Sequence, residues 1–169
     1  MASRVMRLLR HRLVDDRDTR RLLGAAALER IAQRVAGSER HHSGEIRVCI
    51  EAGLPLSYLW RGATARERAV AMFGKLGVWD TEHNNGVLIY LLLAEHRIEI
   101  VADRGVSRHV DATEWATITG TMSEAFRSRD FEAGLLRAID AVDALLVRHY
   151  AVTEGAANRN ELPDAPALH

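Results

Sequence analysis

The sequence is poor in cysteine and in long hydrophobic runs. Its one cysteine, Cys49, excludes a framework of internal disulfides and favours a reducing compartment. The longest apolar stretch covers residues 87–94, far short of the roughly 20 residues that a membrane-spanning helix needs. Arginines interrupt the apolar residues of segment 1–13, so this segment lacks the continuous apolar part of a signal peptide. These absences predict a cytoplasmic protein.

An excess of charge of one sign is also missing. Lysine plus arginine and aspartate plus glutamate each number 23, so the formal net charge is zero. Dedicated nucleic-acid-binding proteins usually carry a clear basic excess. We therefore expect no nucleic-acid partner.

The common catalytic motifs are absent too. The sequence has no G-x-S-x-G, P-loop or G-x-G-x-x-G, and its eight histidines show no zinc-binding spacing. We expect the adjacent His41 and His42 in a solvated loop, and Cys49 as a small buried thiol within a strand. Nucleophilic catalysis therefore has little support.

What is present suffices for one domain with a substantial core, since the chain has 169 residues. Residues 1–17 form a basic arm, residues 18–150 form the domain, and residues 151–169 are expected to be a loosely ordered tail. The arm has two interpretations. It is either a leading helix docked on the protein's own body, which we favour, or an amphipathic segment on an anionic membrane surface.

Hydrophobic periodicity and capping residues predict four helices and three strands. The first strand alternates in polarity and should bury one face, whereas the second is apolar throughout and should be covered on both faces. Asp18 is the expected N-cap of the first helix, and the second and third helices begin with capping-box patterns. The helices are expected at residues 18–36, 64–76, 111–126 and 130–150, and the strands at residues 46–50, 87–93 and 97–101.

The lengths of the connections predict the topology. The second and third strands are joined by a short polar segment, so they should pair antiparallel. The first and second strands are separated by a helix, which favours a parallel, right-handed crossover. Helices on both faces of a small mixed sheet give a three-layer α/β/α sandwich.

The order of these elements and several short motifs resemble the TPM domain family. The resemblance covers roughly residues 44–150 and implies the same sandwich fold. Two further segments, 79–81 and 102–105, look like a short bacterial branch without signal peptide or membrane anchor, whose members resemble proteins found alongside LemA-type membrane proteins. The motifs are Gly44–Val48, Arg66–Gly77, the turn Asn84-Asn85-Gly86, Glu99–Gly105 and Phe131–Leu135.

The resemblance also implies a site for a hard cation, because some TPM members bind Ca²⁺ or Mg²⁺ and a plant member is described as an acid phosphatase. Hard cations need several oxygen ligands, and Asn84 stands where the family has an aspartate, which removes a negative charge. The twelfth position of the loop is Leu91, so the loop is not an EF-hand. The candidate ligands are Asp80, Glu82, Asn84, Asn85, Asp103 and Asp111.

Each of these residues also has a structural explanation. Asp111 with Glu114 fits an N-cap, the Asn84-Asn85-Gly86 turn tolerates left-handed backbone angles, and Asp103 closes a turn before Arg104. We favour the structural explanation for each of them.

Three functions remain open. The first, which we favour, is an interaction module that acts with a membrane-associated, LemA-like system through a surface around Trp79, Asn84 and Arg104. The second is a metal-dependent phosphatase in which Asp103 and Asp111 hold the ion. The third is peripheral membrane binding through the N-terminal arginines, at the inner face of the membrane.

Overall fold

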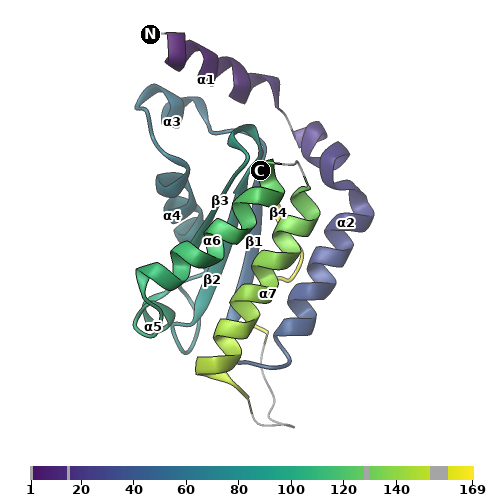
Figure 1. Ribbon diagram of the computed structural model, residues 1–169, viewed down its shortest axis with the longest axis vertical. Helices are drawn as coiled ribbons and strands as arrows, with labels where there is room; N and C mark the ends of the chain where they lie inside the picture. Colours follow the sequence, from purple (N-terminus) through teal and green to yellow (C-terminus); the bar gives the residue numbers. More distant parts are fainter. Residues whose placement is uncertain (1, 15, 128–129, 153–159) are drawn as a thin grey trace.

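A computed structural model of the chain describes residues 2–14, 16–127, 130–152 and 160–169. It contains helices, a short 3₁₀ helix (η1) and a central sheet (Figure 1). The helices are α1 (Ala2–Leu13), α2 (Asp16–Ser38), α3 (Leu56–Trp60), α4 (Ala65–Lys75), η1 (Leu93–Glu95), α5 (Arg104–Ser107), α6 (Ala112–Arg127) and α7 (Phe131–Tyr150). The strands are β1 (Glu45–Glu51), β2 (Gly86–Leu92), β3 (Arg97–Ala102) and β4 (Ala167–Leu168).

The sheet is mixed and has the order β3-β2-β1-β4. β1 and β2 pair parallel, with Glu45 opposite Gly86, while β2 and β3 pair antiparallel, with Val87 opposite Ala102. Both orientations agree with the sequence predictions. The hairpin turns through η1 and His96, whose φ of 49° lies in the left-handed region.

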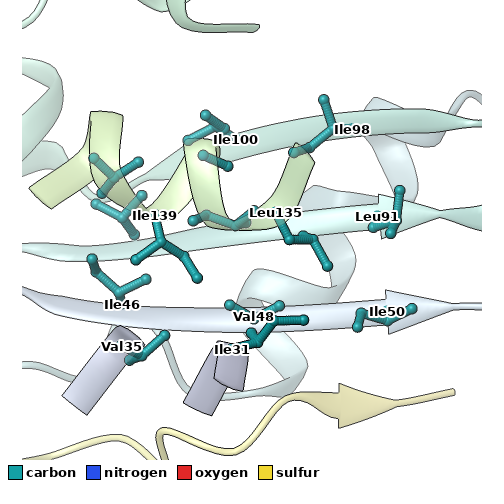
Figure 2. Close-up of a cluster of buried hydrophobic side chains, with 14 of the residues drawn as sticks. Ile31, Val35, Ile46, Val48, Ile50, Leu91, Ile98, Ile100, Leu135 and Ile139 are labelled. Carbon is teal, nitrogen blue, oxygen red and sulfur yellow. The ribbon is translucent and has the colours of Figure 1, made fainter. Parts of the chain in front are cut away.

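One face of the sheet packs against α2, α6 and α7. The core of this layer contains β-branched and leucine side chains from the sheet, α2 and α7 (Figure 2). Every core residue predicted for α7 is buried, because the 3.6-residue period places them on one stripe of the helix. These residues are Phe131, Leu135, Ile139, Val142 and Leu146.

The opposite face packs against α3 and α4. Met72 and Ala69 of α4 lie on the sheet beside Tyr90 and Leu92 of β2. The N-terminus of α4 has the predicted capping box, in which Thr64 accepts from the Glu67 N–H and Glu67 accepts from the Thr64 N–H. The three-layer α/β/α sandwich predicted from the sequence is therefore confirmed.

β1 differs from its prediction, because it is buried on both faces rather than one. Arg47 and Glu51 lie on the polar face and are nevertheless buried. Arg47 donates to the carbonyl oxygens of Pro163 and Ala165. Arg68 binds both carboxylate oxygens of Glu51 at 2.6–3.1 Å. Charged side chains can be buried when they are paired in this way.

The N-terminal part of α2 also differs from expectation. The helix begins at Asp16 and is kinked at Gly24, where φ is 57° and ψ is 159°. A backbone of this kind is essentially restricted to glycine, so the kink has a clear local cause. The side chain of Asp18 lies outside the part of the chain that the structure describes, so its capping role stays a prediction. The predicted end of the helix near Gly37-Ser38 is correct.

The C-terminal segment is ordered where a loose tail was expected. Residues 153–159 lie outside the described residues, but β4 pairs parallel with β1. His169 N–H donates to the carbonyl of Ile50, and Ala52 N–H donates to the carbonyl of His169. The expectation was wrong for residues 160–169 because a two-residue strand carries no periodicity for the sequence to reveal.

Two short helices, α3 and α5, lie where the sequence predicted only loop or turn. They are shorter than the window over which periodicity is visible. None of the helices in the described part of the chain is long and apolar enough to cross a membrane.

Candidate functional site

The loop before β2 and the turn after β3 meet at one end of the sheet, because β2 and β3 are antiparallel. Asp103 N–H donates to the Gly86 carbonyl at 2.9 Å, and Gly105 N–H donates to the Asn84 carbonyl at 2.9 Å. The structure thus brings three of the predicted metal ligands, Asn84, Asn85 and Asp103, into adjoining segments. This end lies near α5, at the bottom of Figure 1.

The close approach of these segments requires glycine. A Cβ added at Gly105 would lie 2.3 Å from the Asn84 carbonyl oxygen, and one at Gly86 would lie 2.0 Å from the Val78 carbonyl oxygen. Both distances are far below those that real Cβ atoms show. Asn84 has a φ of 52°, which an asparagine tolerates better than most residues. The turn is therefore built tightly against α5.

Asn85 and Asp103 are buried at this end and only partly satisfied. The Asn85 side-chain amide donates to the Ser43 carbonyl at 2.9 Å, and its backbone N–H donates to Thr81. Asp103 Oδ1 accepts from Arg104 N–H at 2.6 Å and caps α5. Among the described residues, neither Asn85 Oδ1 nor Asp103 Oδ2 has a hydrogen-bond partner. These two oxygens could accept from water or bind a cation.

The remaining predicted ligands lie elsewhere or in solvent. Asp80 and Glu82 are exposed, as is Asn84 at the site itself. Asp111 Oδ1 accepts from the N–H groups of Thr113 and Glu114, both at 2.8 Å, as the N-cap of α6. Within the described part of the chain, no group of three or more His, Cys, Asp or Glu side chains is arranged to hold a metal ion.

The predicted capping partner of Asp111 acts differently. Glu114 accepts from Arg148 of α7 at 2.8 Å, so its carboxylate ties α6 to α7. The Asp111 half of the predicted capping box is therefore formed, and Glu114 has an arginine of another helix as a charged partner.

The predicted interaction surface is exposed at the same end of the sheet. Trp79 is 55% exposed, and its indole N–H donates to the Gly74 carbonyl at 3.3 Å. Arg104 is exposed at the first position of α5. Asn84, between them in sequence, is fixed by its bond to Gly105. These three residues, Trp79, Asn84 and Arg104, are called the Trp79 surface below.

Sequence reasoning missed a set of buried carboxyl groups beside this site. Glu39 accepts from Ile46 N–H at 3.2 Å, and Glu45 Oε2 accepts from Leu162 N–H at 3.1 Å. Burial, reinforced by the charge of Glu45, raises the pKa of Glu39 to about 8. Burial likewise raises the pKa of Glu45. No local signal marks these residues, because a segment more than a hundred positions away covers Glu45.

The nucleophile candidates remain unsuited to catalysis. Cys49 is buried, and burial raises the pKa of its thiol to about 12, so the reactive thiolate is suppressed.

His41 is exposed as expected, but His42 is fully buried, which corrects the expectation of a solvated loop. Its Nε2 lies 3.4 Å from Asp143 of α7, and burial lowers its pKa.

Comparisons with known proteins agree with this fold. A sequence profile described as the TPM domain matches residues 17–145. The structure is similar to that of the BA42 protein from the psychrophilic bacterium Bizionia argentinensis, with 25% sequence identity and a TM-score of 0.76. That similarity covers 87% of this chain and 95% of BA42.

The fold is also similar to the N-terminal domain of a protein from P. gingivalis. The TM-score is 0.61 at 22% identity, over 79% of this chain and 83% of that one. No curated protein matches the chain. Since the TPM profile covers more than half of the sequence, the chain belongs to the TPM-domain family.

Proposed function

We propose that the chain is an interaction module that binds a membrane-associated protein through the Trp79 surface. The observation that carries this proposal is the exposure of Trp79 on a turn that is held in place. Its ring is fixed by the bond to Gly74, and the neighbouring turn is fixed by Asn84 and Gly105. Tryptophan and arginine dominate the energetic centres of protein interfaces, and Arg104 supplies the second of these.

Rigidity favours binding at this surface. A side chain that is already ordered loses little conformational entropy when a partner covers it. The two carboxylates that a catalytic site would need each use Oδ1 to cap a helix, Asp103 for α5 and Asp111 for α6. A LemA-like membrane protein is the partner suggested by the sequence resemblance.

A photocrosslinking amino acid placed at position 79 tests this proposal. In native cells we expect it to form an adduct with an integral membrane protein, and we expect Arg104→Glu to reduce that adduct at least severalfold. The matched control carries the crosslinker at Val70, which is also exposed on the α4 side of the molecule. An equal adduct from position 70, or none from position 79, would show that this surface does not bind such a partner.

A second function, cation-dependent phosphatase activity, has one specific observation in its favour. Asn85 Oδ1 and Asp103 Oδ2 are buried at one end of the sheet without a partner among the described residues. Two protein oxygens are fewer than the six to eight that calcium takes, so water or substrate would have to complete the shell. When bound, such an ion would polarise a phosphate group and activate water.

Thermal unfolding of metal-stripped protein with Ca²⁺ or Mg²⁺ tests this second function. An ion at a hundredfold excess over its dissociation constant stabilises the folded state by about 2.7 kcal/mol, which raises the Tm by roughly 5–10 °C for a chain of this size. The shift should vanish in Asp103→Asn and persist in Asp130→Asn, which alters an equivalent cap on α7. If the Tm rises with the ion but the protein does not hydrolyse a phosphomonoester, the site binds a cation and the phosphatase function is excluded.

A further inference from the structure

Helix α1 is docked on the protein through its polar side. His11 is buried, its Nε2 lies 3.0 Å from Glu95 Oε1, and its Nδ1 accepts from Leu54 N–H at 3.0 Å. Arg7 donates to Glu95 at 2.8 Å and to the Ala63 carbonyl at 2.7 Å. Helix α1 therefore lies on the protein's own body, as in the interpretation of the N-terminal arm that the sequence favours.

The opposite side of α1 is apolar and faces outward. Val5, Leu9 and Leu13 are four residues apart and Met6 is three before Leu9, so all four share one face of the helix. Their exposed fractions range from 53% for Leu9 to 78% for Leu13. A surface helix normally turns such a face toward the core. Here Arg7 and His11 hold the helix and leave more than half of each of these four side chains exposed.

The charges around this face have one sign. Residues 1–14 contain no aspartate or glutamate, and Arg4, Arg10 and Arg12 are all exposed. Viewed down the helix axis, Arg10 lies next to one edge of the apolar stripe and Arg12 lies next to the other edge. Such a surface is complementary to a negatively charged one.

A tryptophan is exposed beside another side of α1. Trp60, at the end of α3, is 81% exposed, and Leu56 of the same helix is also exposed. Trp60 lines a hollow of about 440 Å³ between α1 and α3, together with Arg4 and Leu8. Figure 1 shows α1 and α3 side by side at the upper end of the molecule, and α5 at the other end.

We propose that this face, formed by Val5, Met6, Leu9 and Leu13, bordered by Arg10 and Arg12 and neighboured by Arg4 and Trp60 at the hollow, docks on an anionic lipid surface. Interfacial helices combine a large apolar face with arginines that contact lipid headgroups, and tryptophan side chains settle at the same depth. The contacts of Arg7 and His11 hold α1 with its apolar face outward. The inference is independent of the partner proposed for the Trp79 surface, which lies at the other end of the sheet.

Co-sedimentation of the full chain with protein-free vesicles tests this inference. We expect binding to vesicles of equimolar phosphatidylcholine and phosphatidylglycerol, and at least tenfold weaker binding to phosphatidylcholine alone. Raising the ionic strength should weaken the first interaction, because salt screens exposed charges. Emission from Trp60 should shift to shorter wavelength on binding, and Trp60→Phe should remove that shift. Equal binding to both lipids, or none to either, would overturn the proposal.

Two pairs of variants separate the contributions. Leu9→Glu should abolish binding, whereas Val147→Glu, which places the same charge at an exposed position of α7, should not. Arg10→Glu with Arg12→Glu should weaken binding at least about tenfold, whereas Arg137→Glu on α7 should change it little. Unchanged thermal unfolding would show that the variants remain folded. If Leu9→Glu binds vesicles like the wild type, or alters only self-association of the chain, the face does not dock on lipid.

Discussion

At the scale of single residues, the chain buries acidic side chains near the candidate site. Glu39 and Glu45 lie close enough for the charge of Glu45 to raise the pKa of Glu39. Their local sequence is unremarkable, since a glutamate at the end of a helix or the start of a strand is usually exposed. Their burial has a measurable consequence for stability.

Glu39 should make the protein less stable as the pH rises. Its pKa is about 8 in the folded state, against an ordinary 4.5. Between these two pH values the folded protein therefore keeps Glu39 protonated, whereas the unfolded chain has released that proton. The free energy of unfolding therefore falls as pH increases across this window, and each 1 kcal/mol lowers the Tm by about 2–4 °C. Glu39→Gln should flatten this pH dependence in thermal unfolding.

The control for this prediction is Glu29→Gln, which changes an exposed glutamate of α2, the helix that ends one residue before Glu39. It should leave the pH dependence as in the wild type. Part of the slope should remain in Glu39→Gln, because burial also raises the pKa of Glu45. An unaltered slope in Glu39→Gln would contradict the assignment.

Gly105→Ala should disrupt the turn that carries Asn84. The new Cβ would meet a backbone carbonyl at 2.3 Å, so the turn and α5 must separate and lose the hydrogen bond between Asn84 and Gly105. We expect a loss of about 1–3 kcal/mol, measured by urea unfolding. Gly74→Ala is the matched control, because nothing lies within 4 Å of its added Cβ. That helical substitution should be neutral or stabilising, and equal losses in both variants would disprove the steric argument.

At the scale of elements, the sequence predicted the core-facing helices well but misjudged β1. The alternation of Ile46, Val48 and Ile50 with polar residues indicates one buried face. The other face is buried because Arg68 of α4 reaches Glu51, and Tyr90 of β2 donates to the same carboxylate at 2.6 Å. A local pattern cannot show that partners from two other elements neutralise these groups.

Arg68→Met should strongly destabilise the protein. It leaves the buried Glu51 carboxylate with the hydrogen bond from Tyr90 but without its charged partner, and removing one partner of a buried ion pair costs about 3–5 kcal/mol. Arg30→Met, which breaks the exposed pair with Glu132, is the control and should have little effect. Denaturant unfolding measures both. The double variant Glu51→Gln with Arg68→Met should lose less than the sum of the single changes, and simple additivity would rule out direct coupling.

Glu95→Gln should loosen α1 without unfolding the sheet. The hydrogen bond from His11, and then that from Arg7, lowers the pKa of Glu95 to about 2, so these contacts stabilise the docked helix above pH 4.5. They are lost as the pH falls toward 2. Hydrogen exchange should be faster in α1 of the variant, while the amides of β1 and β2 keep their protection. Glu82→Gln, which changes an exposed glutamate, should leave hydrogen exchange in α1 unchanged. If Glu95→Gln also left it unchanged, the docking of α1 would not depend on the Glu95 carboxylate.

At the scale of the whole molecule, the C-terminal segment ties the two ends of the sheet together. Glu161 accepts from Glu82 N–H at 3.2 Å beside the candidate site, and Leu162 lies in the core of the α4 layer. Arg47 then holds Pro163 and Ala165, and β4 closes the edge of β1. The segment therefore protects a strand edge that would otherwise be open to pairing with another chain.

Truncation after Pro166 should destabilise the protein and promote association. It removes the pairing of β4 with β1 and the backbone hydrogen bonds of His169 with Ile50 and Ala52, at a cost of about 1–3 kcal/mol. Thermal unfolding and sedimentation velocity measure the two effects. The control replaces Leu168 and His169 by alanine, which keeps the backbone bonds and should remain monodisperse if the wild type is. Association of the control alone would show that side chains, rather than the strand edge, matter.

By itself, the sequence determined the order of the main helices and strands, their orientation in the sheet and the three-layer architecture. These follow from hydrophobic period, capping residues and the lengths of connections, all of which are local. Only the tertiary structure decided which polar groups are buried and which apolar face of α1 is left exposed. Those properties depend on contacts between distant segments, such as Glu45 with Leu162 and His11 with Glu95, and the free energy of a buried charge depends on the partner that packing brings to it.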